Sequence, residues 1–260
     1  MYTVRFSIHG RAKYGVLEGE VVRGFKGSPF AQPGGKTSSF VPDGSTYRLS
    51  EVNLLAPCLP SKIVGLGLNY RELAESVNVP IPQVPLIFLK PPTAVIGPEE
   101  NIVLPRNSGV VEFEGELGVV IGKKAEDVPQ DKASEYIFGY TCINDLTDRK
   151  QQKEDGQWTR AKGYDTFAPI GPCISTGISG DNLKIETYID GELLQSFRTS
   201  DLIFGIPKLI SFVSDVMTLL PGDIIATGTA IGAGELKNGD IIEIIIENVG
   251  TLKNYVVSQS

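Results

Sequence analysis

The stretch FEGELGVVIG, Phe113–Gly122, places two glutamates two residues apart at the start of an apolar run. In a β-strand, residues two apart point to the same face of the sheet, so Glu114 and Glu116 would project together. The run from Leu117 to Ile121 has no polar residue, which is typical of a strand covered on both faces. The sequence therefore predicts a pair of carboxylates at the edge of a hydrophobic core.

Two interpretations of this carboxylate pair are compatible with the pattern. Glu112 would lie on the same face, and the three glutamates could form the solvated face of an edge strand. Alternatively, like-charged carboxylates beside a core need a cation or strong hydrogen-bond donors. The apolar run that follows favours the second interpretation.

Asp145 could add a third carboxylate to this pair. It ends a predicted strand in GYTCINDLTDRKQQ, where a helix is expected to begin, so it could equally be a plain helix N-cap. His9 is the one histidine, and the three cysteines, Cys58, Cys142 and Cys173, show no CxxC spacing. A metal site here would use oxygen ligands, which favours Mg²⁺, admits Mn²⁺ or Ca²⁺, and disfavours Zn²⁺.

The composition excludes several classes of partner. The 260 residues carry a net charge of -7, and no dense cluster of lysine and arginine offsets it, so we expect no nucleic-acid partner. No apolar stretch approaches the roughly 20 residues that span a bilayer. The N-terminus MYTVRFSIHG lacks the apolar core of a signal peptide. We therefore expect a cytoplasmic protein without a membrane partner.

The pattern of elements predicts a β-rich α+β fold. Alternating residues near the N-terminus indicate strands, and a segment rich in Gly, Pro, Ser and Thr follows at residues 26–46. We place a domain boundary near Pro57, which gives a small N-terminal β domain, 1–57, and a larger domain, 58–260. The expected helices lie at residues 69–78, with Asn69 as a possible cap, at 131–138, at 146–154, and from near Pro207 to Leu220.

Two glycine-containing stretches are candidates for ligand-binding loops. IVGLGLNY holds a lone Gly-x-Gly without the third glycine or the acidic ribose partner, so it does not indicate a dinucleotide site. IIATGTAIGAGEL places Thr227, Gly228 and Thr229 in a Gly-rich turn whose N–H and hydroxyl groups could hold a carboxylate. An ordinary loop explains that stretch equally well.

Taken together, the motifs resemble the fumarylacetoacetate hydrolase superfamily, in particular its 2-hydroxyhepta-2,4-diene-1,7-dioate isomerase-like and oxaloacetate tautomerase or decarboxylase-like members. The likeness runs from about Lys62 to Gly250 and rests on the order KIVGLGLNY, PLIFLKPPTAVIGP, EFEGELGVVIG, GYTCINDLTDRKQQ, AKGYDTFAPIGP, DGELLQ, LLPGDIIATGT and NGDIIEIIIENVGTL. It implies a mixed β-sandwich roll, a homodimer, Mg²⁺ or Mn²⁺ as cofactor, and roles such as aromatic catabolism.

The resemblance also implies roles for individual residues. Glu114, Glu116 and Asp145 would be the metal ligands, Lys162 and Gln152 catalytic residues, and Lys90, Arg149, Thr227 and Thr229 substrate-binding residues. Lys162 could either carry a proton or act as a fixed cation that pairs with a substrate carboxylate.

One departure from the family pattern bears on the reaction. Many members carry a histidine in the helix after NY, and a glutamate three residues later, as a pair that activates water or shuttles a proton. This chain has Leu73 and Ser76 there, and Glu72 and Glu75 lie about 100° round the helix from those positions. Smaller departures are Asp148 and Lys150, where the family tends to have Ala and Asp, and Ala230, where it usually has proline.

The resemblance and this departure together predict a class of reaction. A 2-oxo acid or 2-hydroxy-dienoic acid, including dicarboxylates, would react through a metal-bound enolate. Hydrolysis of a C–C bond additionally needs an activated water, so we expect an isomerase or tautomerase ahead of a hydrolase. An oxaloacetate-type decarboxylase is the nearest alternative enzyme. A catalytically weakened protein that binds a metal and a dicarboxylate is the alternative from another class.

Overall fold

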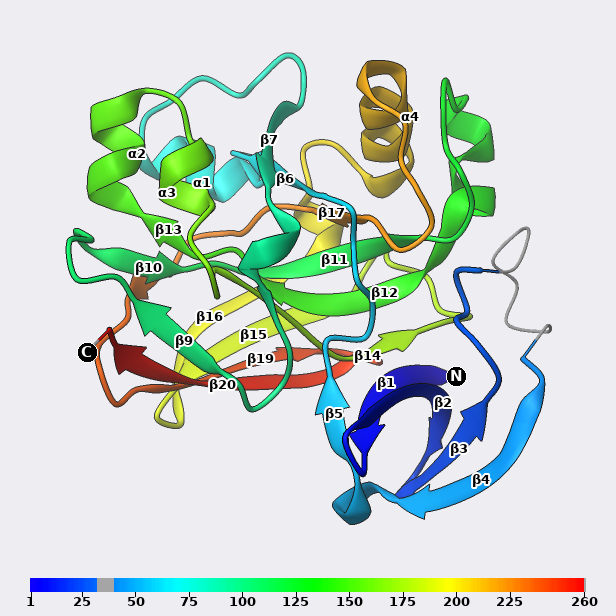
Figure 1. Ribbon diagram of the computed structural model, residues 1–260. Coiled ribbons are helices and arrows are strands. Elements are labelled where there is room, and N and C mark those ends of the chain that lie inside the picture. The colour runs from blue at the N-terminus through cyan, green and yellow to red at the C-terminus, as the bar shows by residue number, and fades with distance from the viewer. Residues whose placement is uncertain (32–39, 260) are drawn as a thin grey trace.

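The computed structural model describes residues 1–31 and 40–259, and β-strands hold many more of these residues than helices do (Figure 1). The described strands form a twelve-stranded, a five-stranded and a three-stranded sheet. The largest sheet is mixed, since β17 pairs in parallel with β6 but antiparallel with β11. The predicted β-rich α+β fold is confirmed.

The largest sheet contains β1 Tyr2–Ile8, β2 Arg11–Glu18, β3 Val21–Phe25, β4 Pro42–Arg48, β5 Asn53–Leu55, β6 Ile63–Gly67, β7 Leu86–Lys90, β8 Val95–Ile96, β11 Gly115–Ile121, β12 Ile137–Asn144, β14 Ala168–Ser175 and β17 Ile224–Ala226. The five-stranded sheet contains β9 Asn101–Leu104, β15 Lys184–Ile189, β16 Glu192–Arg198, β19 Ile241–Ile246 and β20 Gly250–Ser258. The smallest contains β10 Val111–Phe113, β13 Thr147–Asp148 and β18 Gly234–Glu235.

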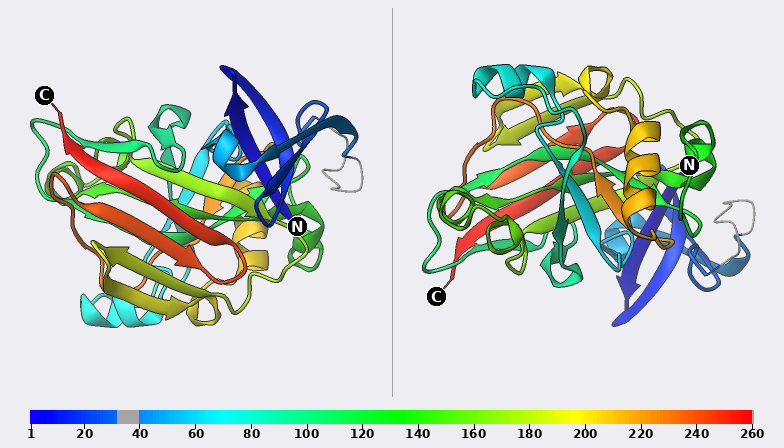
Figure 2. Two further views of the ribbon diagram at one scale, coloured as in Figure 1. Left: turned by 90° about the horizontal axis from the view of Figure 1, so that it is seen from below. Right: turned by 90° about the horizontal axis from the view of Figure 1, so that it is seen from above.

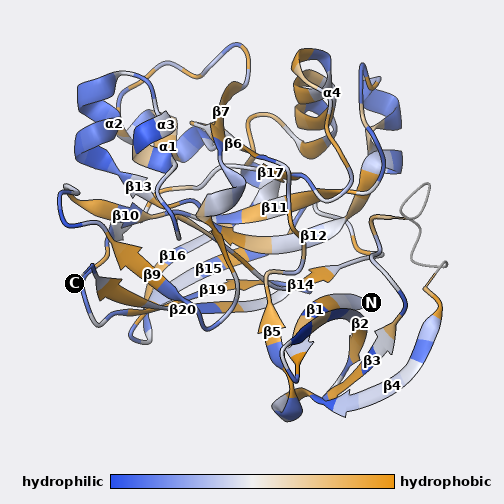
Figure 3. Cartoon of the chain, viewed as in Figure 1, coloured by the Kyte–Doolittle hydropathy of each residue, from blue (hydrophilic) through white to orange (hydrophobic). Residues whose placement is uncertain are grey.

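The described helices are short. The α-helices are α1 Arg71–Ser76, α2 Arg149–Asp155, α3 Thr159–Lys162 and α4 Ile206–Val216. The 3-10 turns are η2 Leu49–Glu51, η3 Pro92–Ala94, η4 Gln130–Tyr136 and η5 Thr199–Asp201. Figure 3 shows hydrophilic residues over α2 and α3 and hydrophobic residues along β11 and β12. The main core cluster joins residues of β11 and of the five-stranded sheet to the buried face of α4.

Strand β11 is covered on both faces, as its apolar sequence indicates. Leu117 and Val119 belong to a cluster that includes Ile185 and Ile244 of the five-stranded sheet. Val120 points the other way, into a second cluster with residues of β12, β14 and β17. Because its neighbours on both sides are apolar, β11 is a rigid support for the glutamates at its start.

The N-terminal strands extend the largest sheet. β1 pairs antiparallel with β14, with Tyr2 opposite Ser175, and Figure 2 shows β1–β4 at one corner of the molecule, away from α1. They have an apolar cluster of their own, formed by Val4, Phe6 and Val22 with Cys173 of β14. Residues 32–39 of the Gly-rich segment lie outside the described residues, and part of the remainder forms β4. The division at Pro57 stays a prediction.

Two of the expected helices differ from the structure because backbone groups find other partners. Residues 131–138 form the 3-10 turn η4 and the start of β12, instead of an α-helix. α4 ends at Val216, because the backbone of Leu219 exchanges hydrogen bonds with Ala125. Leu220 therefore lies beyond the helix that we expected to include it.

The other two expected helices begin later than predicted. α2 begins at Arg149, since Thr147 and Asp148 pair with β10. α1 begins at Arg71, and Asn69 does not cap it. The side chain of Asn69 instead donates to the carbonyls of Phe204 and Thr227 and accepts from Phe204 N–H.

Candidate metal centre and substrate cavity

The carboxylates lie where the chain changes sheet. The chain leaves β10 at Glu114 to enter β11, and it leaves β12 at Asp145 to enter β13. The two crossings are joined, because Asp145 N–H donates to Glu114 O at 2.9 Å. β11 pairs with β12 and β10 pairs with β13, so the two changes of sheet fall side by side. The fold thus brings Glu114 and Asp145 together although they are far apart in sequence.

Gly115 lets the two glutamates approach this crossing. A side chain there would collide with the hydroxyl of Thr187 and crowd Gln195 Oε1. Gly115 N–H donates to that same Gln195 oxygen at 3.2 Å. The small residue between Glu114 and Glu116 is therefore required by close packing against β15 and β16.

The three carboxylates form one buried cluster. Oxygen atoms of Glu114, Glu116 and Asp145 lie within 4.8 Å of one another. The three residues are 7%, 0% and 0% exposed. The interpretation of a solvated edge-strand face is therefore wrong for Glu114 and Glu116. Glu112 is half-buried and bonds to Arg149 Nε at 2.6 Å instead of joining the cluster.

Asp145 is not a helix cap. Asp148 caps α2, because its Oδ1 accepts from Gln151 N–H at 3.1 Å. The carboxylate of Asp145 accepts from Lys90 Nζ at 2.5 Å and from Lys162 Nζ at 2.6 Å. The alternative role of Asp145 is thus excluded by the later start of the helix.

Basic side chains surround the cluster. Lys162 Nζ also bonds to Glu114 Oε2 at 2.9 Å, and Arg149 Nη2 bonds to Glu114 Oε1 at 2.8 Å. With Glu112 included, four carboxylates face three cations, and the group would carry one net negative charge with every member ionised. A bound divalent cation would change this to one net positive charge, which suits an anionic substrate.

Burial and neighbouring charges shift the pKa values in the cluster. Burial, followed by the charges of Asp145 and Glu114, raises the pKa of Glu116 well above its usual value. Burial lowers the pKa of Lys90. Burial also acts to lower the pKa of Lys162, but the charges of Asp145 and Glu114 outweigh it, and that pKa is raised. In the metal-free protein Lys162 is therefore held as a cation, paired with Glu114 and Asp145.

The residues present fit a hard divalent cation. Glu116 Oε2 accepts from Gly228 N–H at 2.8 Å, but its buried Oε1 has no hydrogen-bond partner among the described residues. A buried carboxylate oxygen without a donor is costly unless a cation neutralises it. The ligand atoms are all oxygens, as Mg²⁺ and Mn²⁺ prefer. Glu114, Glu116 and Asp145 could therefore hold such an ion.

The loop after β17 is hydrogen-bonded to β11 beside the carboxylate cluster. Thr227 Oγ1 donates to Leu117 O at 3.0 Å, and Thr229 Oγ1 donates to Gly115 O at 2.9 Å. Gln195 Nε2 donates to Thr229 Oγ1 at 2.9 Å, and so connects this loop to β16. Gly228 has a φ of 95°, which glycine adopts without strain, and this conformation accompanies the bond from its N–H to Glu116.

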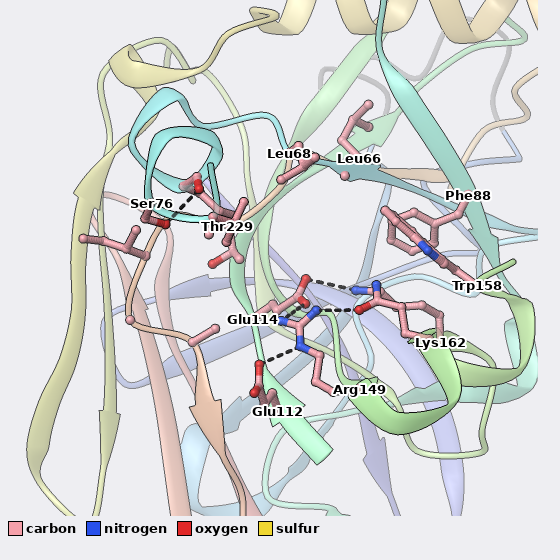
Figure 4. A pocket seen from close by; sticks show the side chains of 17 residues that line it. Leu66, Leu68, Ser76, Phe88, Glu112, Glu114, Arg149, Trp158, Lys162 and Thr229 are labelled. Atoms are coloured by element: carbon pink, nitrogen blue, oxygen red, sulfur yellow. Dashed lines mark hydrogen bonds and ion pairs between the residues drawn. The ribbon is translucent and has the colours of Figure 1, made fainter. Parts of the chain in front are cut away.

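A cavity of about 430 Å³ opens beside the cluster (Figure 4). Four of the predicted substrate-site residues line it: Arg149, Gln152, Lys162 and Thr229. The other two are not among its lining residues. Lys90 is fully buried against Asp145, and the buried hydroxyl of Thr227 is bonded to β11. Figure 4 shows Glu112, Glu114, Arg149 and Lys162 on one side of the cavity and Leu66 and Leu68 on the other.

Helix α1 presents Leu73 and Ser76 to the cavity, at the positions where a histidine and a glutamate were expected from the family pattern. Glu72 and Glu75 line a different cavity, together with Arg71 and Asp201. Neither glutamate on α1 therefore replaces the missing pair.

Sequence reasoning missed several residues around the cavity. Phe88 and Trp158 contact edge to face at 5.4 Å between ring centroids, and both line the cavity, as do Leu66 and Ile231. Apart from the indole N–H of Trp158 these side chains are apolar, and none is a type that ligates a metal, so no pattern of ligand types could select them. Gln195 was also missed, although it ends the quoted DGELLQ motif, and an isolated glutamine near an exposed hairpin gives no signal of burial.

A β-rich sandwich with three clustered carboxylates beside a substrate-sized cavity defines a class of enzymes that use a divalent cation on small acids. The family model described as fumarylacetoacetate (FAA) hydrolase C-terminal matches residues 62–257, and the model described as Rv2993c-like, N-terminal, matches residues 1–57. The chain belongs to the fumarylacetoacetate hydrolase family.

Individual relatives are similar over most of their length. The structure of 5-carboxymethyl-2-hydroxymuconate delta-isomerase from Mycobacterium smegmatis is 41% identical, with a TM-score of 0.91 and 100% of each chain covered. Maleylpyruvate hydrolase from Sphingobium sp. SYK-6, in complex with manganese(II) and pyruvate, is 30% identical, with a TM-score of 0.82 and 100% of each chain covered. Oxaloacetate tautomerase FAHD2B from Bos taurus is 41% identical over 80% of this chain and 70% of its own.

The described residues include no helix that is long and apolar enough to cross a membrane.

Proposed function

We propose that this chain is a divalent-metal-dependent tautomerase or isomerase that moves the proton on C3 of a 2-oxo acid. The observation that carries the proposal is the composition of the cavity wall. It includes Glu114 of the buried carboxylate cluster and the apolar Leu73, which lies where the family pattern has the water-activating histidine. Proton movement at C3 needs no activated water, whereas hydrolysis of a C–C bond does.

The side chains of the cavity have separable tasks in this proposal. Glu114, Glu116 and Asp145 would hold the cation, for which we propose Mg²⁺ or Mn²⁺. The bound cation would supply electrophilic stabilisation of the negative charge that develops on the 2-oxygen. Arg149, which already bonds to Glu112 and Glu114, presents its guanidinium to the cavity and can orient the substrate carboxylate.

Lys162 and Gln152 complete the charged side. Lys162 keeps its ammonium between Glu114 and Asp145 and 4.8 Å from the centroid of the Phe88 ring. It can attract an anionic substrate while it holds the two carboxylates in place. Gln152 Oε1 accepts from Arg149 Nη1 at 2.9 Å, which fixes the guanidinium at the cavity wall. We propose that Gln152 acts through Arg149.

The names of the relatives support this reading, since they include an isomerase and an oxaloacetate tautomerase, and one relative was solved with manganese and pyruvate. The relatives are enzymes of small oxo acids and dicarboxylic acids. The homodimer, the cytoplasmic location and the preference for Mg²⁺ stay predictions from the family resemblance and the sequence.

The decay of the enol forms of oxaloacetate and phenylpyruvate tests the proposal. We expect both Mg²⁺ and Mn²⁺ to accelerate the decay of at least one enol, and a chelator to remove the effect. Pyruvate is assayed in parallel, because its release from oxaloacetate would identify a decarboxylase instead. No acceleration of either enol by the metal-loaded protein would contradict the proposal and favour a binding protein.

A further inference from the structure

We propose that the cavity selects 2-oxo acids whose far end is apolar, and that it disfavours a second carboxylate at that end. This inference rests on the proposed function, because it places the 2-oxo acid group against the charged side of the cavity.

The charged side is confined to one part of the cavity. Glu112, Glu114, Arg149 and Lys162 gather there, connected by ion pairs of 2.6–2.9 Å (Figure 4). Gln152 adds a polar group through its bond to Arg149. The carboxylate and keto oxygens of a substrate are therefore drawn to this side, and the rest of the molecule must extend away from it.

The remaining wall is mostly apolar and comes from several separate segments. Leu66 and Leu68 flank the end of β6, Leu73 projects from α1, Phe88 from β7, and Ile231 from the loop after β17; Trp158 precedes α3. Figure 4 shows Leu66 and Leu68 across the cavity from the charged group, and Phe88 and Trp158 beside each other on its flank. An alkyl or aryl group placed here would bury apolar surface on several sides.

Among the residues that the structure describes, no cation lies at this wall to pair with a second carboxylate. The basic residues that line the cavity are Arg149 and Lys162, and both lie on the charged side. Lys90 is buried behind Asp145, and Arg71 lines a different cavity. A carboxylate at the far end would lose hydration without meeting a cation among the described lining residues, which is unfavourable.

Leu73 has a decisive position in this wall. It lies on the cavity-facing side of α1 and packs against the main core cluster, so its side chain cannot simply swing away. Its neighbour on the same face, Ser76, is turned back onto the helix, since its hydroxyl donates to Leu73 O at 2.8 Å. Helix α1 thus contributes an apolar surface to the cavity, with no charged group directed at the substrate.

A pair of acids with matched shapes tests this selectivity. In 5-methyl-2-oxohexanoate, an isopropyl group replaces the distal carboxylate of 2-oxoglutarate with nearly the same shape. Calorimetric titration of the Mg²⁺-loaded protein should show that 5-methyl-2-oxohexanoate binds at least about tenfold more tightly. Equal affinities, tighter binding of 2-oxoglutarate, or no binding of either acid would overturn the inference.

A second readout separates this inference from the proposed function. Exchange of the C3 protons with deuterium oxide, followed by NMR, reports proton removal from either acid. Absence of exchange for both acids, together with preferential binding of 5-methyl-2-oxohexanoate, would remove the proposed function but leave the selectivity intact. Exchange of the C3 protons without a binding preference would support the proposed function and contradict the selectivity.

Substitutions on α1 test the role of Leu73. Leu73→Arg places a cation on the apolar wall and should tighten the binding of 2-oxoglutarate by at least about tenfold. Glu75→Gln is the matched control, because it makes the same change in net charge on the same helix but lines the other cavity. It should leave both affinities within about twofold. Similar effects of the two variants on the affinity for 2-oxoglutarate would contradict the proposed role of Leu73. If Leu73→Arg fails to fold, the comparison of the two acids with the wild-type protein decides.

Discussion

Glu116→Gln should stabilise the metal-free protein and remove its response to metal. Oxygen atoms of the triad lie within 4.8 Å of one another, and two unit charges at that separation repel by about 3 kcal/mol at an effective dielectric constant of about 20. Lys90 and Lys162 offset part of this repulsion. Because burial and the neighbouring carboxylates raise the pKa of Glu116, folding of the metal-free protein must either protonate this side chain or bury its charge. Glu116→Gln requires neither, so it should raise the free energy of unfolding of the metal-free protein by about 1–2 kcal/mol near neutral pH. That gain corresponds to about 2–8 °C in Tm.

Binding of the metal should stabilise the wild-type protein. At a cation concentration about 100 times the dissociation constant, binding adds about 2.7 kcal/mol to the free energy of unfolding. Tm should then rise by about 5–10 °C. Glu116→Gln should lose most of this rise, because the amide oxygen is a weaker ligand and carries no charge.

Thermal unfolding with Mg²⁺, with Mn²⁺ and with a chelator measures both effects. Glu112→Gln is the matched control: it removes a carboxylate from the same stretch of chain, but from one that bonds to Arg149 and lies outside the triad. That variant should keep the metal-dependent rise. The reasoning is refuted if metal-free Glu116→Gln is less stable than metal-free wild type, or if it keeps the full rise with metal.

Three further predictions concern the cavity and the N-terminal strands. Lys162→Met, assayed with saturating Mg²⁺, should raise KM by about tenfold while kcat changes by less than about threefold; a fall in kcat of about a hundredfold would make Lys162 a proton carrier. Leu73→His combined with Ser76→Glu should produce metal-dependent C–C hydrolysis of a 2,4-dioxo acid, in which water adds to the C4 carbonyl and C3 leaves as the enolate of the 2-oxo acid, at least about tenfold above wild type, and no gain would show that other groups are missing. Asp43→Asn should lower the free energy of unfolding by about 1 kcal/mol near neutral pH. A side-chain hydrogen bond from Lys13 is the largest cause that lowers the pKa of Asp43 to about 2, so this stabilisation is present above the ordinary value of 3.8 and is lost as pH falls through about 2. Denaturant unfolding of both proteins at neutral and acid pH checks that the difference shrinks on acidification.

The apolar run after Glu116 predicted the central strand of the fold well, because burial on both faces leaves a direct trace in residue type. Helix boundaries were predicted less well. α4 ends before Leu219, which pairs with Ala125, and α2 begins later than predicted because Thr147 and Asp148 pair with β10. These partners are distant in sequence, so no local pattern announces them.

The candidate site, too, was predicted only in part by the sequence pattern. Strand periodicity places Glu114 and Glu116 on a common face, but it does not show that Asp145 reaches them, since that depends on two neighbouring changes of sheet. The family resemblance supplied this connection. The apolar wall of the cavity could not be predicted, because residues such as Leu66 and Trp158 come from separate segments and look like ordinary core residues in sequence.

The exchange of C3 protons for deuterium in a 2-oxo acid measures directly whether the metal-loaded protein removes a proton from C3. The 5-methyl-2-oxohexanoate described above is incubated in deuterium oxide with wild type plus Mg²⁺ or Mn²⁺, with wild type plus chelator, and with Glu116→Gln plus metal. We expect rapid exchange only in the metal-loaded wild type, without cleavage of the carbon chain. Absence of exchange in the metal-loaded wild type, or exchange that persists with the chelator, would contradict the proposed function.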